Sequence, residues 1–80
     1  MGEYNKPVPT KCWEAFLTSC GCTYDRQDGT HHHWKCPNCW RTITFWGHKK
    51  EVPRFHIGTC LKTMGKTNSD FNKWAKKNCK

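Results

Sequence analysis

The sequence predicts a small α+β domain in the order α-β-β-β-α, with a further short helix near its C-terminal end. Two stretches carry apolar residues at helical spacing, and three short runs between them have the composition of strands. A chain of 80 residues is the size of one domain. We expect residues 10–77 to form that domain, between a flexible N-terminal tail (1–9) and a C-terminal tail (78–80).

The first helix is expected from Thr10 to about Cys20. Thr10 can cap its N-terminus, and Gly21 is suited to end it in the left-handed conformation. The apolar residues of this stretch fall on one face of a helix; they are Trp13, Phe16, Leu17 and Cys20.

Two more helices are expected in the C-terminal half. The stretch "HIGTCLKTM" (56–64) places Ile57, Leu61 and Met64 on one helical face, and Gly65 stops it. A last short helix is expected after Ser69, with an apolar stripe of Phe71 and Trp74.

Three strands are expected between the helices, over residues 22–26, 30–35 and 41–46. The letters "QDG" indicate a turn between the first two, and "CPNC" a tight connection before the third. Side chains alternate between the two faces of a strand, so His31 and His33 share one face and His32 and Trp34 the other. We expect Trp34 to pack under the helices, which leaves His31 and His33 facing solvent.

The chain is strongly basic. It has 14 Lys+Arg against 6 Asp+Glu and a formal net charge of +8, which favours a polyanionic partner. Its 5 Trp, 4 Phe and 2 Tyr are residues that stack on bases, although core packing accounts for most aromatic residues in a domain. Nucleic acid is therefore the expected partner, with an anionic protein surface as the alternative.

No secretory signal and no membrane-spanning run stand out in the sequence. We therefore expect a cytoplasmic protein without a membrane partner, in which cysteines stay reduced and paired cysteines favour metal binding over disulfides.

The stretch "GCTYDRQDGTHHHWKC" resembles the central motif of the HicA family of toxin ribonucleases. That motif runs from a helix ending in Gly plus an apolar residue through Arg-Gln-x-Gly-Ser/Thr-His into a strand; its positions are here Gly21, Cys22, Arg26, Gln27, Gly29, Thr30 and His31. "ITFWGH" is similar to the family's third strand, "GTCLKTMG" to its second helix and "DFNKW" to its trailing helix. The resemblance covers about residues 8–75.

The resemblance implies a double-stranded-RNA-binding-like fold, in which a three-stranded antiparallel sheet carries its helices on one face. It also implies translation-independent cleavage of mRNA by a toxin that a HicB-type antitoxin blocks. His31 stands at the position of the family's essential histidine. Cys22 and the "CPNC" turn depart from the family's pattern, which has an apolar residue and a polar turn there.

The residues themselves agree in part with an RNA-cleaving site. Cleavage needs one group to take the proton of the 2′-hydroxyl and one to protonate the leaving 5′-oxygen, and imidazole titrates near neutral pH. We expect His31 to be catalytic. Four neighbours are expected to contact RNA on the same face and to stabilise the phosphate: Arg26, His33, Lys35 and Arg41.

"CPNC" (36–39) is a zinc-knuckle signature, and two pairs of residues could complete a zinc site. His56 and Cys60 would give C-x2-C-x16-H-x3-C, as in a zinc finger, whereas Cys20 and Cys22 would give C-x-C-x13-C-x2-C. On the fold that the resemblance implies, the third strand carries His56 away from the turn. That fold favours one structural zinc ion per chain, held by Cys20, Cys22, Cys36 and Cys39. The alternative is that "CPNC" is a turn with reduced, unused thiols, or a redox pair.

The remaining cysteines are interpreted without a metal. Cys12 and Cys60 are expected to pack in helices as small apolar residues, and Cys79 to be a thiol in the tail. Two functions compete with the toxin ribonuclease. One is a non-catalytic, zinc-stabilised module that binds RNA or DNA, and the other is a small zinc-finger regulator with the C-C-H-C site.

Overall fold

The computed structural model describes residues 7–37, 39, 41–47 and 50–79. Within these ranges the chain forms eight elements: β1 (Val8–Pro9), α1 (Thr10–Ser19), β2 (Thr23–Asp28), β3 (His31–Lys35), β4 (Ile43–Trp46), β5 (Glu51–Val52), α2 (Arg54–Met64) and α3 (Asn68–Asn78). The predicted α+β class and the order α-β-β-β-α are confirmed, with a third helix and two further short strands. No helix in the described ranges has the length and apolar character needed to cross a bilayer.

The main sheet is antiparallel, with strand order β2-β3-β4. Trp34 pairs with Ile43 across the β3–β4 ladder, and both are buried, as is Phe45 opposite His32. The face that carries these residues is the one that the helices cover. His31 and His33 therefore project from the opposite face, and the predicted strand register is confirmed.

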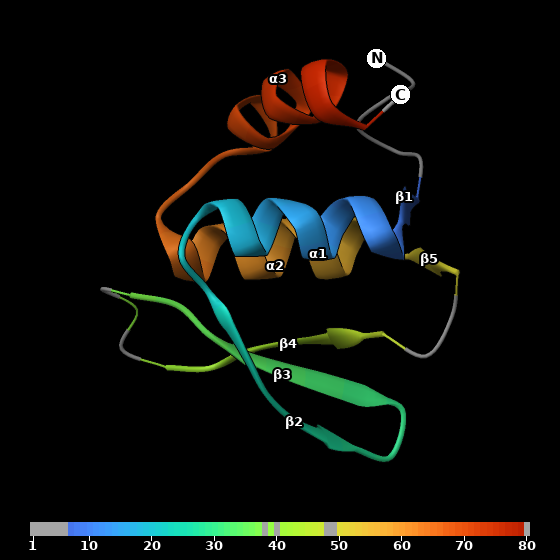
Figure 1. Ribbon diagram of the computed structural model, residues 1–80, viewed down its shortest axis with the longest axis vertical. Coiled ribbons are helices and arrows are strands. Elements are labelled where there is room, and N and C mark those ends of the chain that lie inside the picture. Colours follow the sequence, from blue (N-terminus) through green and yellow to red (C-terminus); the bar gives the residue numbers. More distant parts are fainter. Residues whose placement is uncertain (1–6, 38, 40, 48–49, 80) are drawn as a thin grey trace.

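The helices lie on one side of the sheet, as the resemblance implied. Figure 1 shows α1 and α2 on the same side of the sheet, with α3 farther from the sheet than both. Helix α1 buries the face predicted from its spacing, including Trp13, Phe16 and Leu17. Gly21 has φ +86°, so the left-handed backbone expected after α1 is present. Thr10 is the first helical residue and Pro9 the N-cap, without a side-chain cap bond.

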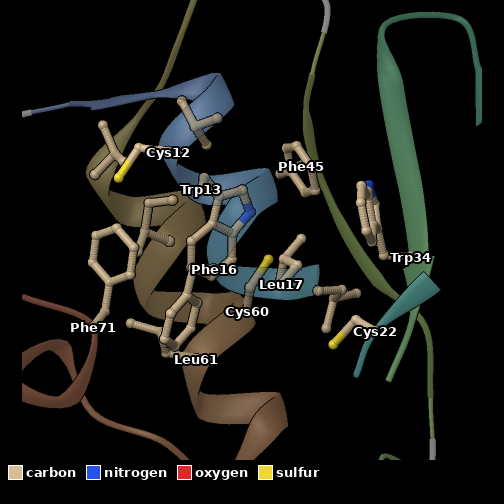
Figure 2. Close-up of a cluster of buried hydrophobic side chains, with 14 residues drawn as sticks. Cys12, Trp13, Phe16, Leu17, Cys22, Trp34, Phe45, Cys60, Leu61 and Phe71 are labelled. Atoms are coloured by element: carbon tan, nitrogen blue, oxygen red, sulfur yellow. The ribbon is translucent and has the colours of Figure 1, made fainter. Parts of the chain in front are cut away.

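Aromatic rings join the layers in the core. The Trp13 side chain is fully buried, and its ring centroid lies 5.6 Å from that of Phe16, 6.2 Å from that of Phe45 and 5.4 Å from that of Phe71. Figure 2 shows these rings between α1, β4 and the start of α3. Trp13 thus connects the sheet with α3. This packing holds the helices on one face of the sheet and leaves the other face open.

A short second sheet was not expected from the sequence. Strand β1 pairs with β5, with Val8 opposite Val52, and both valines are buried. These strands are two residues long, so they carry no periodic pattern that could predict them. Val8 and Pro9, which were assigned to the N-terminal tail, lie in this sheet, whereas residues 1–6 are outside the described ranges.

Helix α3 is longer than predicted. It begins at Asn68, where Thr67 and Asp70 form a reciprocal capping box, and it runs to Asn78. The backbone N–H of Thr67 donates to the Asp70 carboxylate, and these bonds hold the Asp70 pKa below its ordinary value. Thr67 rather than Ser69 is therefore the start signal.

The interpretation of Cys12 and Cys79 as separate thiols is wrong. The two sulfur atoms form a disulfide, with 5.7 Å between the Cα atoms. Figure 1 shows the end of α3 close to the start of α1, so a partner 67 residues away reaches Cys12. The bond joins the start of the first helix to the end of the last one, a tertiary contact that the separate sequence patterns do not encode.

Candidate functional site

The face of the main sheet that points away from the helices carries polar and basic side chains. Cross-strand partners share a face, so the register places on it Arg26 and Asp28 from β2, His31, His33 and Lys35 from β3, and Thr44 and Trp46 from β4. His31 is exposed, whereas His32 on the other face is partly buried beside Phe45, with ring centroids 6.1 Å apart. Four of the five predicted catalytic and RNA-binding residues therefore lie on one open surface.

The His31 imidazole is held by a tryptophan from the neighbouring strand. Trp46 stands opposite His31 in the β3–β4 register, and its indole Nε1 donates a hydrogen bond of 3.0 Å to His31 Nε2. An indole nitrogen can only donate, so Nε2 accepts and the neutral imidazole carries its proton on Nδ1. Trp46 therefore fixes both the orientation and the tautomer of the candidate catalytic group.

A second imidazole, that of His56 in the first turn of α2, adjoins the same tryptophan. The backbone N–H of Trp46 donates to His56 Nδ1 at 3.2 Å, and the two ring centroids are 4.7 Å apart. Burial lowers the His56 pKa, and the positive charge of a protonated His31 lowers it further. The two histidines are thus electrostatically coupled on either side of Trp46.

Sequence reasoning missed this arrangement, because it considered His56 only as an alternative zinc ligand. His56 and Cys60 both satisfy backbone groups of β4, since Cys60 Sγ also donates to the carbonyl oxygen of Thr44 at 3.3 Å. The spacing of four between these residues, next to a strand with polar alternation, was the available signal. It could be interpreted only once α2 was known to flank β4.

The lowered His56 pKa predicts a loss of stability in acid. The folded protein binds fewer protons at His56 than the unfolded chain, so this contribution is present above the ordinary pKa of 6.5 and is lost as the pH falls through the folded-state value. We expect the midpoint of thermal unfolding to fall as the pH is lowered below 6.5, and to fall less in His56→Asn. Asparagine keeps an acceptor for the Trp46 N–H but does not titrate. The control is His33→Asn, which removes a histidine elsewhere on the sheet and should behave like the wild type. An equal fall of the unfolding midpoint in His56→Asn and the wild type would contradict this account.

Two of the predicted phosphate-binding cations, Arg26 and Lys35, share contacts with one carboxylate. Asp25 bonds to Arg26 at 2.7 Å and lies 3.7 Å from the Lys35 ammonium, at the point where the β2–β3 register shifts. Lys35 is four residues from His31 along β3, a distance of about 13 Å. Lys35 is therefore offset from His31 by roughly two nucleotides of an extended RNA strand, whereas Arg26, the register partner of His33, lies closer to His31.

The other two predicted RNA contacts, His33 and Arg41, take no part in the ion pairs with Asp25. His33 Nδ1 is 2.9 Å from the Thr44 hydroxyl, and its buried Nε2 has no hydrogen-bond partner. Arg41 is exposed just before β4 and lines a hollow of about 240 Å³ between β4 and α2, together with Thr44 and Thr59.

Of the four cysteines predicted to bind zinc, two form a disulfide and two are free thiols. The hairpin brings Cys22 and Cys36 together, as the topology required, but the two sulfur atoms form a disulfide, with 4.0 Å between the Cα atoms. Cys20 and Cys39 are free and partly buried. No group of three or more His, Cys, Asp or Glu side chains in the described ranges is placed to hold a metal ion. The zinc-knuckle interpretation is therefore without structural support, and zinc binding stays a prediction for the reduced protein.

The alternative C-C-H-C zinc site is not assembled in this structure. His56 adjoins Trp46, whose cross-strand partner His31 is at the opposite end of β3 from Cys36. Cys60 is buried, and burial raises the pKa of its thiol to about 12, so the thiolate that zinc requires is strongly disfavoured.

The state of these cysteines can be measured directly. We expect the intact mass of unreduced protein to be lower than that of reduced protein by the hydrogens of two disulfides, Cys12–Cys79 and Cys22–Cys36. For protein kept reduced and free of chelators, we expect one zinc per chain, lost in Cys20→Ser and in Cys39→Ser but kept in the control Cys60→Ser. Reduced protein without stoichiometric zinc would refute the zinc prediction while leaving the disulfides untouched.

The site can now be compared with known proteins. No curated protein and no solved structure matches the chain. The sequence profile of one family, described as HicA toxin of bacterial toxin-antitoxin, matches residues 13–65. That range includes α1 from Trp13 onward, the whole main sheet, α2 and both histidines beside Trp46. Because the match covers well over half of the chain and the fold is the one expected of such a domain, this protein belongs to the HicA toxin family.

Proposed function

We propose that this toxin cleaves mRNA on the open face of its main sheet, with His31 as a proton-transfer group. Members of the HicA family are generally ribonucleases that act within toxin–antitoxin pairs, and the family match supports that general activity. The observation that carries the assignment of His31 is its position: an exposed imidazole on an open face, with its ring fixed by Trp46 and a second imidazole behind that ring.

The proposed reaction is an internal displacement at phosphorus. The 2′-oxygen of one nucleotide attacks its own 3′-phosphate, a new O2′–P bond forms, and the P–O5′ bond to the next nucleotide breaks. His31 Nε2, released from the Trp46 indole, takes the proton of the 2′-hydroxyl. The leaving 5′-oxygen must gain a proton, and we assign its delivery to His56. Burial lowers the His56 pKa in the free protein, but the negative charge of a bound phosphate opposes that effect and favours the protonated imidazole in the RNA complex.

Basic residues on and beside the sheet would hold the RNA strand on either side of the reacting phosphate. Arg26, Lys35 and Arg41 are exposed, and the chain has a formal net charge of +8. Contacts of this kind release counterions from RNA, so we expect affinity to fall steeply with added salt. Affinity that stays flat as salt rises would favour an anionic protein partner instead.

The Asp25 carboxylate is expected to weaken RNA binding, because it neutralises Arg26 and Lys35 on the proposed surface. We predict that Asp25→Asn raises affinity for RNA by up to about fivefold, the effect of freeing exposed ion pairs of this kind. Glu51→Gln in β5 makes the same change in net charge outside the main sheet and is the matched control. Equal gains in RNA affinity in both variants would mean that only net charge matters and that RNA does not bind beside Asp25.

Expression in a bacterial host tests the proposed function as a whole. Induction of the wild-type chain should arrest growth and shorten cellular mRNA, and co-expression of a HicB-type protein encoded next to it should restore growth. Arrest without mRNA cleavage, or binding of RNA by a chain that is harmless, would contradict the ribonuclease. The second result would favour a binding module on the same scaffold.

A further inference from the structure

A row of four rings runs from the start of α2 to His31. The ring centroids of Phe55 and His56 are 4.5 Å apart, those of His56 and Trp46 are 4.7 Å apart, and those of Trp46 and His31 are 6.4 Å apart. Phe55 and Trp46 also approach directly, with centroids 6.4 Å apart and ring planes at 81°. The rings come from three elements, so the fold rather than one local pattern assembles them.

Phe55, at the outer end of this row, is open to solvent. Its exposed fraction is 68%, whereas the apolar residues that α2 turns inward, Ile57 and Leu61, are at most 1% exposed. Phe55 therefore adds little to the core. Its ring stands at 88° to that of His56 and at 81° to that of Trp46, and most of its surface is free to accept a further planar group.

We propose that Phe55 and Trp46 form a subsite that binds one unpaired nucleobase beside the phosphate at His31. The exposed Phe55 ring adjoins the partly buried Trp46 ring, in one row with the histidine that is proposed to contact the RNA backbone. Proteins combine base stacking with phosphate contacts in this way on single strands. The chain's charge of +8 supplies the attraction to the backbone. The proposal rests on the proposed function and specifies its substrate as single-stranded RNA.

The fold by itself would not predict a single-stranded substrate. Domains of the double-stranded-RNA-binding type recognise duplexes by shape and through the sugar-phosphate backbone, and bases within a duplex are stacked on one another. An aromatic subsite is useful only for a base that has left such a stack. Phe55 and Trp46 thus discriminate between two classes of RNA that would both satisfy the positive charge.

Binding of an RNA that cannot be cleaved isolates this subsite from the chemistry. The probe is a short unpaired RNA with 2′-O-methyl groups, and the readout is its dissociation constant. Phe55→Ala should weaken binding by roughly 5- to 150-fold, the usual effect of losing a stacked base, and Phe55→Trp should keep it. Tyr24→Ala is the matched control, since Tyr24 is 51% exposed but packs against Trp34 on the other face of the sheet.

A base scan then locates the subsite. Removing the base at each position of a cleavable RNA in turn should slow cleavage at one fixed position relative to the cut in wild-type protein, and this dependence should vanish in Phe55→Ala. A duplex of the same sequence should bind wild type and Phe55→Ala equally.

The results separate the subsite from the proposed function. If wild type cleaves RNA but Phe55→Ala binds and cleaves like wild type, the subsite is wrong and the ribonuclease stands. Equal losses in Phe55→Ala and Tyr24→Ala would also overturn the subsite. If wild-type protein neither binds nor cleaves RNA, the proposed function itself fails.

Discussion

Replacing His31 by alanine is expected to abolish RNA cleavage and toxicity while leaving the fold intact. The His31 side chain is exposed and accepts a hydrogen bond from Trp46. Its removal should therefore change the free energy of unfolding by about 0.5 kcal/mol or less. Loss of a positioned proton-transfer group should slow cleavage by roughly 100-fold or more. Cleavage rate and urea unfolding, measured on the same preparation, separate the two effects.

His32→Ala is the matched control, and it should behave in the opposite way. His32 lies on the helix-facing side, next to Phe45 and Tyr24, and a side chain at Gly47 would collide with its ring. Its removal should lower stability and affect cleavage only through that loss. If His32→Ala stopped cleavage in folded protein while His31→Ala did not, the catalytic assignment would be wrong.

Replacing Trp13 by alanine is expected to have the largest effect on stability. Its ring is fully buried and contacts rings from α1, β4 and α3, so the substitution leaves a cavity between all three layers. Such losses cost about 3–5 kcal/mol, a large part of the stability of a domain this small. We expect Trp13→Ala to be mostly unfolded near physiological temperature.

Trp13→Phe refines this prediction. The buried Nε1 of Trp13 has no hydrogen-bond partner, so phenylalanine removes an unsatisfied donor while keeping an aromatic ring. We expect its loss of stability to be smaller than that of Trp13→Ala in denaturant unfolding. Phe55→Ala, an aromatic truncation on the surface, should leave the unfolding midpoint almost unchanged. A similar loss in Trp13→Ala and Phe55→Ala would contradict the packing described.

The elements that sequence reasoning predicted well are those set by local periodicity. The spacing of Trp13, Phe16 and Leu17 gave the buried face of α1, and alternation through the histidine run placed His31 outward and His32 inward. The motif around "RQDGTHHH" also indicated the family, because the family's motif has the same residue types at the same spacing, within one hairpin.

The features that were missed depend on contacts between distant segments. The Cys12–Cys79 disulfide needs α3 to return to the start of α1, and the Trp46–His56 contact needs α2 to flank β4. Asp25 meets both Arg26 and Lys35 next to a register shift that no local pattern signals. Pairing of "CPNC" with the segment around Cys22 was anticipated, but the chemistry of the pair was not, since spacing cannot distinguish a disulfide from a thiolate ligand set.

The chemical nature of the cleavage tests the central claim most directly. If imidazoles on the open sheet face activate a 2′-hydroxyl, purified wild-type protein should cut single-stranded RNA to leave a 2′,3′-cyclic phosphate and a 5′-hydroxyl. A 2′-deoxynucleotide at the cut position should then stop cleavage there, and His31→Ala should be inactive on both RNAs. Cleavage across the 2′-deoxy position at the wild-type rate, or an active His31→Ala variant, would contradict the account.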